Sequence, residues 1–164
     1  MSYQTVFGST QAYDKGGVQV IDANPKHYVF SNVFEVAATS KPYEKVAVAK
    51  NLKYVLEATR AEGVSPWFTA SHDEAALVMD GEVEVRLIKP DQPLVPETKE
   101  GTVKLAAEPK GRNMGWIRAS RGHMALLPKG AAYQFRAITP GVMLLQTITG
   151  DCTVEKWADI CQTA

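Results

Sequence analysis

Two histidines and one glutamate are the residues of this sequence best suited to bind a metal ion. His72 lies two residues before Glu74, so on a regular strand both side chains point the same way. Neutral imidazoles with one carboxylate suit iron, manganese or zinc, and His123 is the obvious third ligand. One interpretation is a rearranged metal site of His72, Glu74 and His123. The alternative, which we favour, is that both histidines are ordinary polar residues, because metal sites need tightly shaped surroundings.

The sequence offers no other catalytic set. It contains no G-x-S-x-G motif, no P-loop, no G-x-G-x-x-G motif and no paired carboxylates at a useful spacing. Cys152 and Cys161 fit neither a disulfide framework nor a C-x-x-C pair. Trp67 follows Pro66 and is a candidate to stack on an aromatic ligand, with coverage of the core as the alternative interpretation. We therefore predict no catalytic residue and no metal ligand set in this chain.

Size and charge exclude several classes of partner. The 164 residues suit a single domain, which we expect to span 1–164. Lys plus Arg and Asp plus Glu number 18 each, so no net charge attracts nucleic acid or an anionic membrane. No apolar run has the roughly 18 residues of a membrane span, and no leader pattern opens the chain. We expect a soluble, cytoplasmic protein.

The elements that must position these residues are mostly short strands. An N-terminal arm (1–27) and a proline-rich excursion between strands (89–113) flank them. We predict strands at 28–36, 52–59, 75–79, 82–87, 115–118, 124–127, 132–137 and 142–149, and helices at 40–51 and from 153. Asp80-Gly81 predicts a hairpin turn between two of the strands. The pattern predicts an all-β fold of jelly-roll type with short helices at its margins.

Alternation of residue types predicts which strands are buried. Leu52, Tyr54, Leu56 and Ala58 alternate with Lys53, Val55, Glu57 and Thr59, as in a strand with one buried face. The segment 75–79 is apolar throughout, so both of its faces should be covered, whereas the segment 82–87 should have one face in water.

Two frames in the chain resemble the motifs of the cupin superfamily. Glu74 and Gly81 match the end of the first motif, G-x5-H-x-H-x3-4-E-x6-G. Gly122, Pro128 and Gly130 match the start of the second motif, G-x5-P-x-G-x2-H-x3-N. The resemblance implies a cupin-type jelly-roll barrel. In cupins, three histidines and the glutamate bind a divalent metal ion.

The histidine positions of the first motif are occupied by other residues. With three residues before Glu74 the positions hold Phe68 and Ala70, and with four they hold Trp67 and Thr69. Neither spacing offers a nitrogen ligand. Glu74 is therefore a vestigial metal position.

The second motif has changed in the same way. Its histidine position is Tyr133 and its asparagine position is Ala137. A glutamate inside the barrel needs a partner or a proton. We expect a buried Glu-Tyr or Glu-Arg contact to Glu74, and the candidates are His72, Tyr133, Arg118, Arg121 and Arg136.

The whole chain is similar to the small subunit of the two-component hydroquinone 1,2-dioxygenases. The likeness lies in its length, the long N-terminal arm, SPWFTASHDEAALVMDGEVEV and GHMALLPKGAAYQF. This resemblance implies a heterotetramer of two small and two large subunits. It also implies that a cupin domain of the large subunit holds a non-haem Fe(II), which is used to cleave hydroquinone with O2 to 4-hydroxymuconic semialdehyde.

The resemblance makes this chain a metal-free accessory subunit, inactive alone, whose cofactor belongs to its partner. As substrate contacts in a shared pocket we expect Trp67, His72 and Tyr133. Two rival functions remain open. One is a stand-alone, metal-free cupin that binds a small molecule, and the other is a self-sufficient enzyme using the rearranged site of His72, Glu74 and His123.

Overall fold

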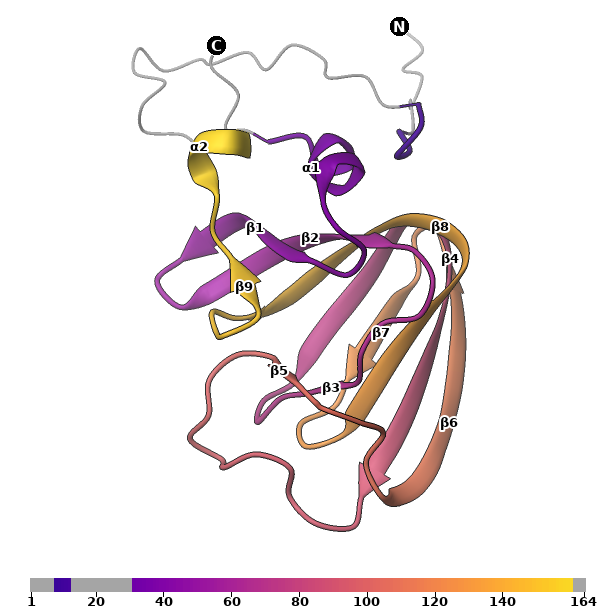
Figure 1. Ribbon diagram of the computed structural model, residues 1–164, viewed down its shortest axis with the longest axis vertical. Coiled ribbons are helices and arrows are strands. Elements are labelled where there is room, and N and C mark those ends of the chain that lie inside the picture. Colours follow the sequence, from indigo (N-terminus) through magenta and orange to yellow (C-terminus); the bar gives the residue numbers. More distant parts are fainter. Residues whose placement is uncertain (1–7, 13–30, 161–164) are drawn as a thin grey trace, which may run out of the picture.

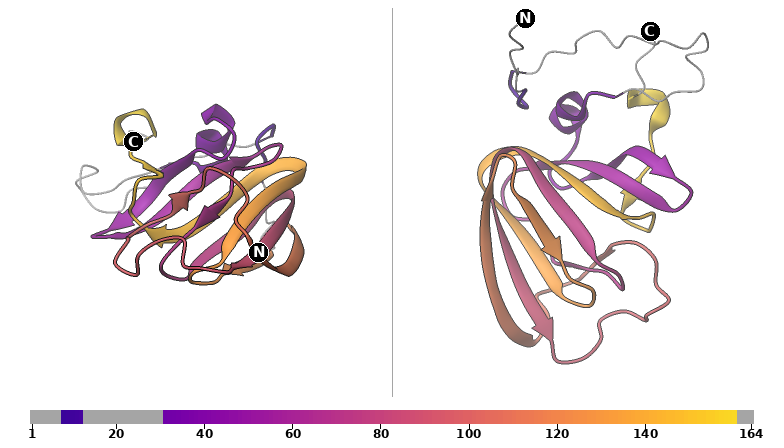
Figure 2. Two further views of the ribbon diagram at one scale, coloured as in Figure 1. Left: turned by 60° about the horizontal axis from the view of Figure 1, so that its bottom comes forward. Right: turned by 180° about the vertical axis from the view of Figure 1, so that it is seen from behind.

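The computed structural model describes residues 8–12 and 31–160. Within this part of the chain, nine strands join one hydrogen-bonded sheet that curls on itself, with two short helices beside it (Figures 1 and 2). The elements are α1 (Val33–Thr39), β1 (Lys45–Asn51), β2 (Tyr54–Ala61), β3 (Phe68–Thr69), β4 (Glu74–Pro90), β5 (Val103–Lys104), β6 (Gly111–Ser120), β7 (Met124–Leu127), β8 (Ala132–Ile148), β9 (Thr153–Val154) and α2 (Trp157–Ile160).

The pairing of the strands places the core inside the curl. β4 pairs with β6, β7 and β8, and β8 continues to β2, which pairs with β1. The inward-facing side chains form the largest buried cluster, which includes Phe68, Leu127, Tyr133, Phe135 and Leu145. The all-β prediction is confirmed. Among the described residues, neither helix has the length and apolar character of a membrane-spanning segment.

The predicted strand at 28–36 is wrong where the structure describes it. Asn32 caps a helix there, since its side chain accepts hydrogen bonds from the backbone N–H groups of Phe34 (3.0 Å) and Glu35 (3.3 Å). Val36 and Ala37 are the buried face of α1, which packs on the outside of β2. The cap outweighs the β preference of the aromatic and branched residues. Residues 28–30, like most of the predicted arm, lie outside the described residues.

The predicted helix at 40–51 is also wrong. Ser40 closes α1, because its hydroxyl donates to the Val36 carbonyl at 2.6 Å, and residues from Lys45 to Asn51 form β1. Pairing with β2 on one side and with β9 on the other overrides the weak helical preference of this segment. The strand at 52–59 is confirmed as β2, which begins at Tyr54. Val55, Glu57 and Thr59 lie on its inward face, and Ala58 on the opposite face is also buried, next to α1.

The predicted hairpin at Asp80-Gly81 does not form. β4 runs through both residues and stays paired with β8, and the register shifts at this point in a β-bulge. Gly81 has a φ of 78°, and a Cβ there would lie 2.7 Å from the Thr139 carbonyl oxygen. The glycine therefore serves the close approach of two bending strands. On either side of it inward residues are buried and outward ones half-buried, so only one face of 75–79 is fully covered.

The remaining strand predictions are confirmed with shifted ends. The segment 124–127 is β7, 115–118 lies inside β6, and 132–137 and 142–149 are two parts of the single strand β8. The C-terminal helix is limited to Trp157–Ile160 and follows β9, while residues 161–164 lie outside the described residues. The extent of a single domain over 1–164 stays a prediction.

Candidate functional site

Cross-strand pairing brings the two cupin motifs together. β3 and β8 pair with Phe68 opposite Tyr133, and the centroids of the two rings lie 5.8 Å apart inside the barrel. Trp67 points to the other side of the sheet, where it packs with Ile88 and Ala132. The spacing of three residues before Glu74 is therefore the one that the fold uses. The histidine positions are Phe68, Ala70 and Tyr133.

Glu74 is buried and receives three hydrogen bonds from hydroxyl groups. The Tyr133 hydroxyl donates to Oε2 at 2.6 Å, and the hydroxyls of Thr102 and Thr147 donate to Oε1 at 2.5 and 2.6 Å. Glu74 is 2% exposed, so these three hydroxyl groups take the place of water as hydrogen-bond donors to its carboxylate. Three donors suit an ionised carboxylate, which only accepts. The predicted Glu-Tyr contact is confirmed.

Burial has a further effect on Tyr133. It raises the pKa of the phenol well above its ordinary value, and the charge of Glu74 raises that pKa further. The phenol therefore stays protonated and keeps donating to Glu74.

The arginine candidates bind other carboxylates. Arg118 pairs with Glu82, Arg121 with Asp80 at 2.7 Å, and Arg136 with Glu84 at 3.8 Å. These carboxylates belong to the central part of β4, several residues beyond Glu74. The predicted Glu-Arg contact is therefore absent at this site.

His72 joins the glutamate cluster at its edge. Its Nε2 lies 3.1 Å from the Thr147 hydroxyl. The single hydroxyl proton of Thr147 goes to Glu74, so Nε2 must be the donor of this bond. The other ring nitrogen of His72, Nδ1, is buried with no hydrogen-bond partner among the described residues.

The proposed metal site of His72, Glu74 and His123 is not assembled. His123 is exposed in the turn between β6 and β7, where its Nδ1 lies 3.0 Å from the Ser120 carbonyl oxygen. The backbone carbonyl of His123 accepts a hydrogen bond from the N–H group of Val78 on β4. Val78 lies four residues beyond Glu74, so the backbone positions of these two residues are roughly 13 Å apart along the strand. Within residues 8–12 and 31–160, no group of three His, Cys, Asp or Glu side chains is placed to hold a metal ion. The donor set therefore does not fit a cupin metal.

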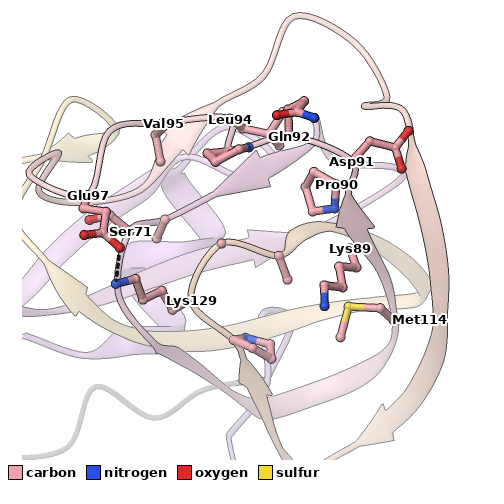
Figure 3. A pocket seen from close by; sticks show the side chains of 15 residues that line it. Ser71, Lys89, Pro90, Asp91, Gln92, Leu94, Val95, Glu97, Met114 and Lys129 are labelled. Carbon is pink, nitrogen blue, oxygen red and sulfur yellow. Dashed lines mark hydrogen bonds and ion pairs between the residues drawn. The ribbon is translucent and has the colours of Figure 1, made fainter.

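Two pockets lie near this region. The larger, about 550 Å³, lies between the segment 89–97 and the turn after β7, and Lys129 and Glu97 form a 3.2 Å ion pair at one edge of it (Figure 3). The other, about 340 Å³, opens on the outside of the sheet beside His72 and Leu126. Trp67 and Tyr133 line neither pocket, because they are 5% and 1% exposed.

Several residues around Glu74 were not predicted from the sequence. Thr102 and Thr147 bond to Glu74, and Lys45 and Glu57 form a buried pair nearby. Thr102 lies in a charged loop and gives no signal. Glu57 and Thr59 do give a signal in the sequence, because strand alternation places both on the same face as the apolar residue Val55.

Comparison with solved structures identifies the family. The chain matches hydroquinone 1,2-dioxygenase from Sphingomonas sp. TTNP3 with 4-hydroxybenzoate bound, at 55% identity and a TM-score of 0.92 over 99% of both chains. It also matches hydroquinone 1,2-dioxygenase PnpCD in complex with Cd2+ and 4-hydroxybenzonitrile, at 54% identity and a TM-score of 0.91 over 99% of this chain and 98% of that chain. The chain belongs to the hydroquinone 1,2-dioxygenase family. The predicted cupin fold is thereby confirmed.

Structures of the same enzymes also contain a longer chain with a related fold. The chain matches one in PnpCD in complex with Fe3+ at 12% identity and a TM-score of 0.61, over 85% of this chain and 38% of that chain. At that identity the likeness shows the fold alone. No family model and no curated protein matched the chain.

Proposed function

We propose that this chain is the small, metal-free subunit of a two-component hydroquinone 1,2-dioxygenase, and that the longer cupin subunit holds the Fe(II). One observation carries the proposal. The chain matches a chain of known dioxygenases from end to end, while its own motif positions hold Phe68, Ala70 and Tyr133 in place of histidines. The reaction proposed for the complex is cleavage of hydroquinone with O2 to 4-hydroxymuconic semialdehyde.

Two kinds of chain in the related enzymes support a partner. In the Sphingomonas sp. TTNP3 enzyme, one chain is covered to 99% by this sequence, and a chain in its complex with 4-nitrophenol is covered to 36%. The second chain is therefore much longer and carries additional structure. An α2β2 heterotetramer in the cytoplasm stays our prediction for this protein.

An exposed apolar surface supports the same proposal. On the outside of the sheet, one row crosses four strands through Leu56, Gln146, Ala75 and Leu126. Leu56 is 40% exposed and Leu126 is 58% exposed, and the neighbouring Tyr54 and Met124 are also exposed. Exposed apolar faces of this kind are typical of protein interfaces. We propose that the longer subunit packs on this surface, the outer row.

The predicted substrate contacts differ in their access to such a partner. His72 lines the pocket beside Leu126, so it is the best placed of the three to face a molecule held at the interface. Trp67 and Tyr133 are buried, and they would touch substrate only after the surrounding side chains move. Contact of Trp67, His72 and Tyr133 with a small aromatic substrate stays a prediction.

Co-expression with a longer cupin chain from the same organism tests the function. We expect a complex that contains stoichiometric iron and consumes O2 with hydroquinone, whereas this chain alone does neither. Light scattering of the purified complex gives its stoichiometry. Stoichiometric iron and ring cleavage by this chain alone would refute the proposal, and aromatic binding without any complex would favour the stand-alone module.

Matched surface variants test the proposed interface. Leu126→Lys places a charge in the outer row and should lower the yield of complex at least tenfold, because a buried unpaired charge is costly. Val64→Lys is the control, since Val64 is 60% exposed but pairs with Arg136, near the other end of β8. Equal loss in both variants, or none in either, would exclude the outer row as the interface.

A further inference from the structure

A buried lysine lies among the former metal-ligand positions. Lys45 begins β1 and is 3% exposed, and its Nζ lies 4.0 Å from Oε2 of the fully buried Glu57. Among the described residues, neither of these two atoms has a hydrogen-bond partner. The two groups thus face each other in the barrel as an ion pair, while the other carboxylate oxygen of Glu57, Oε1, accepts a 2.7 Å hydrogen bond from the Thr153 hydroxyl.

The ammonium group lies beside two of the three histidine positions. Its Nζ is 4.8 Å from the ring centroid of Phe68 and 5.9 Å from that of Tyr133. The faces of aromatic rings are negative and attract a cation at such distances. The two rings at the cupin histidine positions therefore contact a cation, and this cation is covalently attached to the chain.

The ammonium group offsets the negative charge of buried carboxylates. Glu57 and Glu74 are both buried, and burial raises the pKa of Glu57. The charge of Lys45 and the hydrogen bond from Thr153 lower that pKa, and the charge of Glu74 raises it. Two buried carboxylates without a cation would cost the fold heavily. One ammonium among them reduces that cost.

We propose that the Lys45 ammonium is the resident cation of this cupin centre. It occupies the space beside Phe68 and Tyr133 and supplies the positive charge that a bound metal ion supplies in metal-binding cupins. The barrel thereby keeps a charged centre without a metal ion. A charged centre of this kind is a property of the folded chain, whatever its enzymatic function.

Removal of the ammonium tests the proposal. In the full chain, Lys45→Met should lower the melting temperature by roughly 10 °C, because it leaves a buried carboxylate unpaired. The control is Lys50→Met on the same strand, which breaks a 2.5 Å ion pair to Glu155 between side chains 31% and 36% exposed and should cost about 2 °C or less. Equal shifts in the two variants would overturn the proposal.

Chemical rescue distinguishes a cation site from ordinary packing. Lys45→Ala refolded in roughly 100 mM methylammonium should recover at least half of its lost melting temperature, because a ligand bound only by the folded state stabilises it. Sodium chloride at the same concentration is the control for ionic strength. Recovery that is no better in methylammonium than in sodium would overturn the proposal.

A measurement on the unmodified chain tests the proposal even if the Lys45 variants fail to fold. In a sample labelled with 13C-lysine, one lysine ε-methylene should be shifted upfield by ring currents, and Phe68→Leu should reduce that shift. A spectrum in which every lysine ε-methylene has an ordinary shift would show that the ammonium does not lie on these rings, and would overturn the proposal.

Discussion

Replacing Glu74 by glutamine would test whether the former metal position now serves stability. An amide keeps one acceptor oxygen but presents an NH2 group in place of the other. If the amide oxygen stays with the hydroxyls of Thr102 and Thr147, the NH2 group faces the Tyr133 hydroxyl, which can then only accept and no longer has the carboxylate oxygen to donate to. At least one bond to a charged acceptor is then lost, at about 1.5–3 kcal/mol.

This loss should be visible as a lower melting temperature. For a chain of 164 residues, about 1 kcal/mol corresponds to about 2–4 °C, so Glu74→Gln should melt roughly 3–12 °C lower. Iron bound by the assembled complex, measured by mass spectrometry, should not change. Lost iron with unchanged melting would refute a structural role for Glu74.

Tyr133→Phe completes a double-mutant cycle with Glu74→Gln. Both changes remove the same 2.6 Å bond, so the double variant should be little less stable than the worse single variant. Urea unfolding of all four proteins at pH 7 gives the coupling free energy, which should be about 1 kcal/mol or more. Strictly additive losses would mean that the two groups do not depend on each other, contrary to the geometry.

Two further predictions concern buried aromatic residues. Burial raises the pKa of Tyr43 from 10.0 to about 12, so the stability that this phenol contributes is present below pH 10 and is lost as the pH rises from 10 to 12. In urea titrations, Tyr43→Phe should lack this part of the alkaline loss of stability. Trp67→Ala should cost about 3–5 kcal/mol of stability, because Trp67 is 5% exposed and packs on Ile88 and Ala132. Steady-state kinetics of the complex then decide its role, since an unchanged KM for hydroquinone would place Trp67 among the structural residues.

The contact between Glu74 and Tyr133 could be predicted because the two motifs specify register. A residue seven positions before a glycine and one three positions after another glycine acquire spatial meaning once the motifs are aligned. Burial then demands a partner for the carboxylate. The hydroxyls of Thr102 and Thr147 could not be found in this way, since they come from a loop and from the far end of β8.

The role of Lys45 was hidden by an error in secondary structure. The segment from Glu44 to Lys50 has the composition of a short helix, and a lysine on a short helix is normally exposed. Only the tertiary pairing with β2 and β9 turns it into a strand and points Lys45 inward. The Asp80-Gly81 signal failed for a related reason, because a glycine that permits a turn equally permits a bulge between long strands.

The pairing of β4 with β8 determines how late in synthesis the sheet can be completed. Val85 pairs with Phe135 and Ala75 pairs with Gln146, so β4 leaves the ribosome long before its partner exists. At about 5–20 residues per second, a delay of roughly 50–70 residues lasts about 3–14 s. During that time, of its three partner strands, β4 can pair only with β6 and β7. Newly made chains are therefore most vulnerable to aggregation just before β8 is complete, and slower synthesis at lower temperature lengthens that interval.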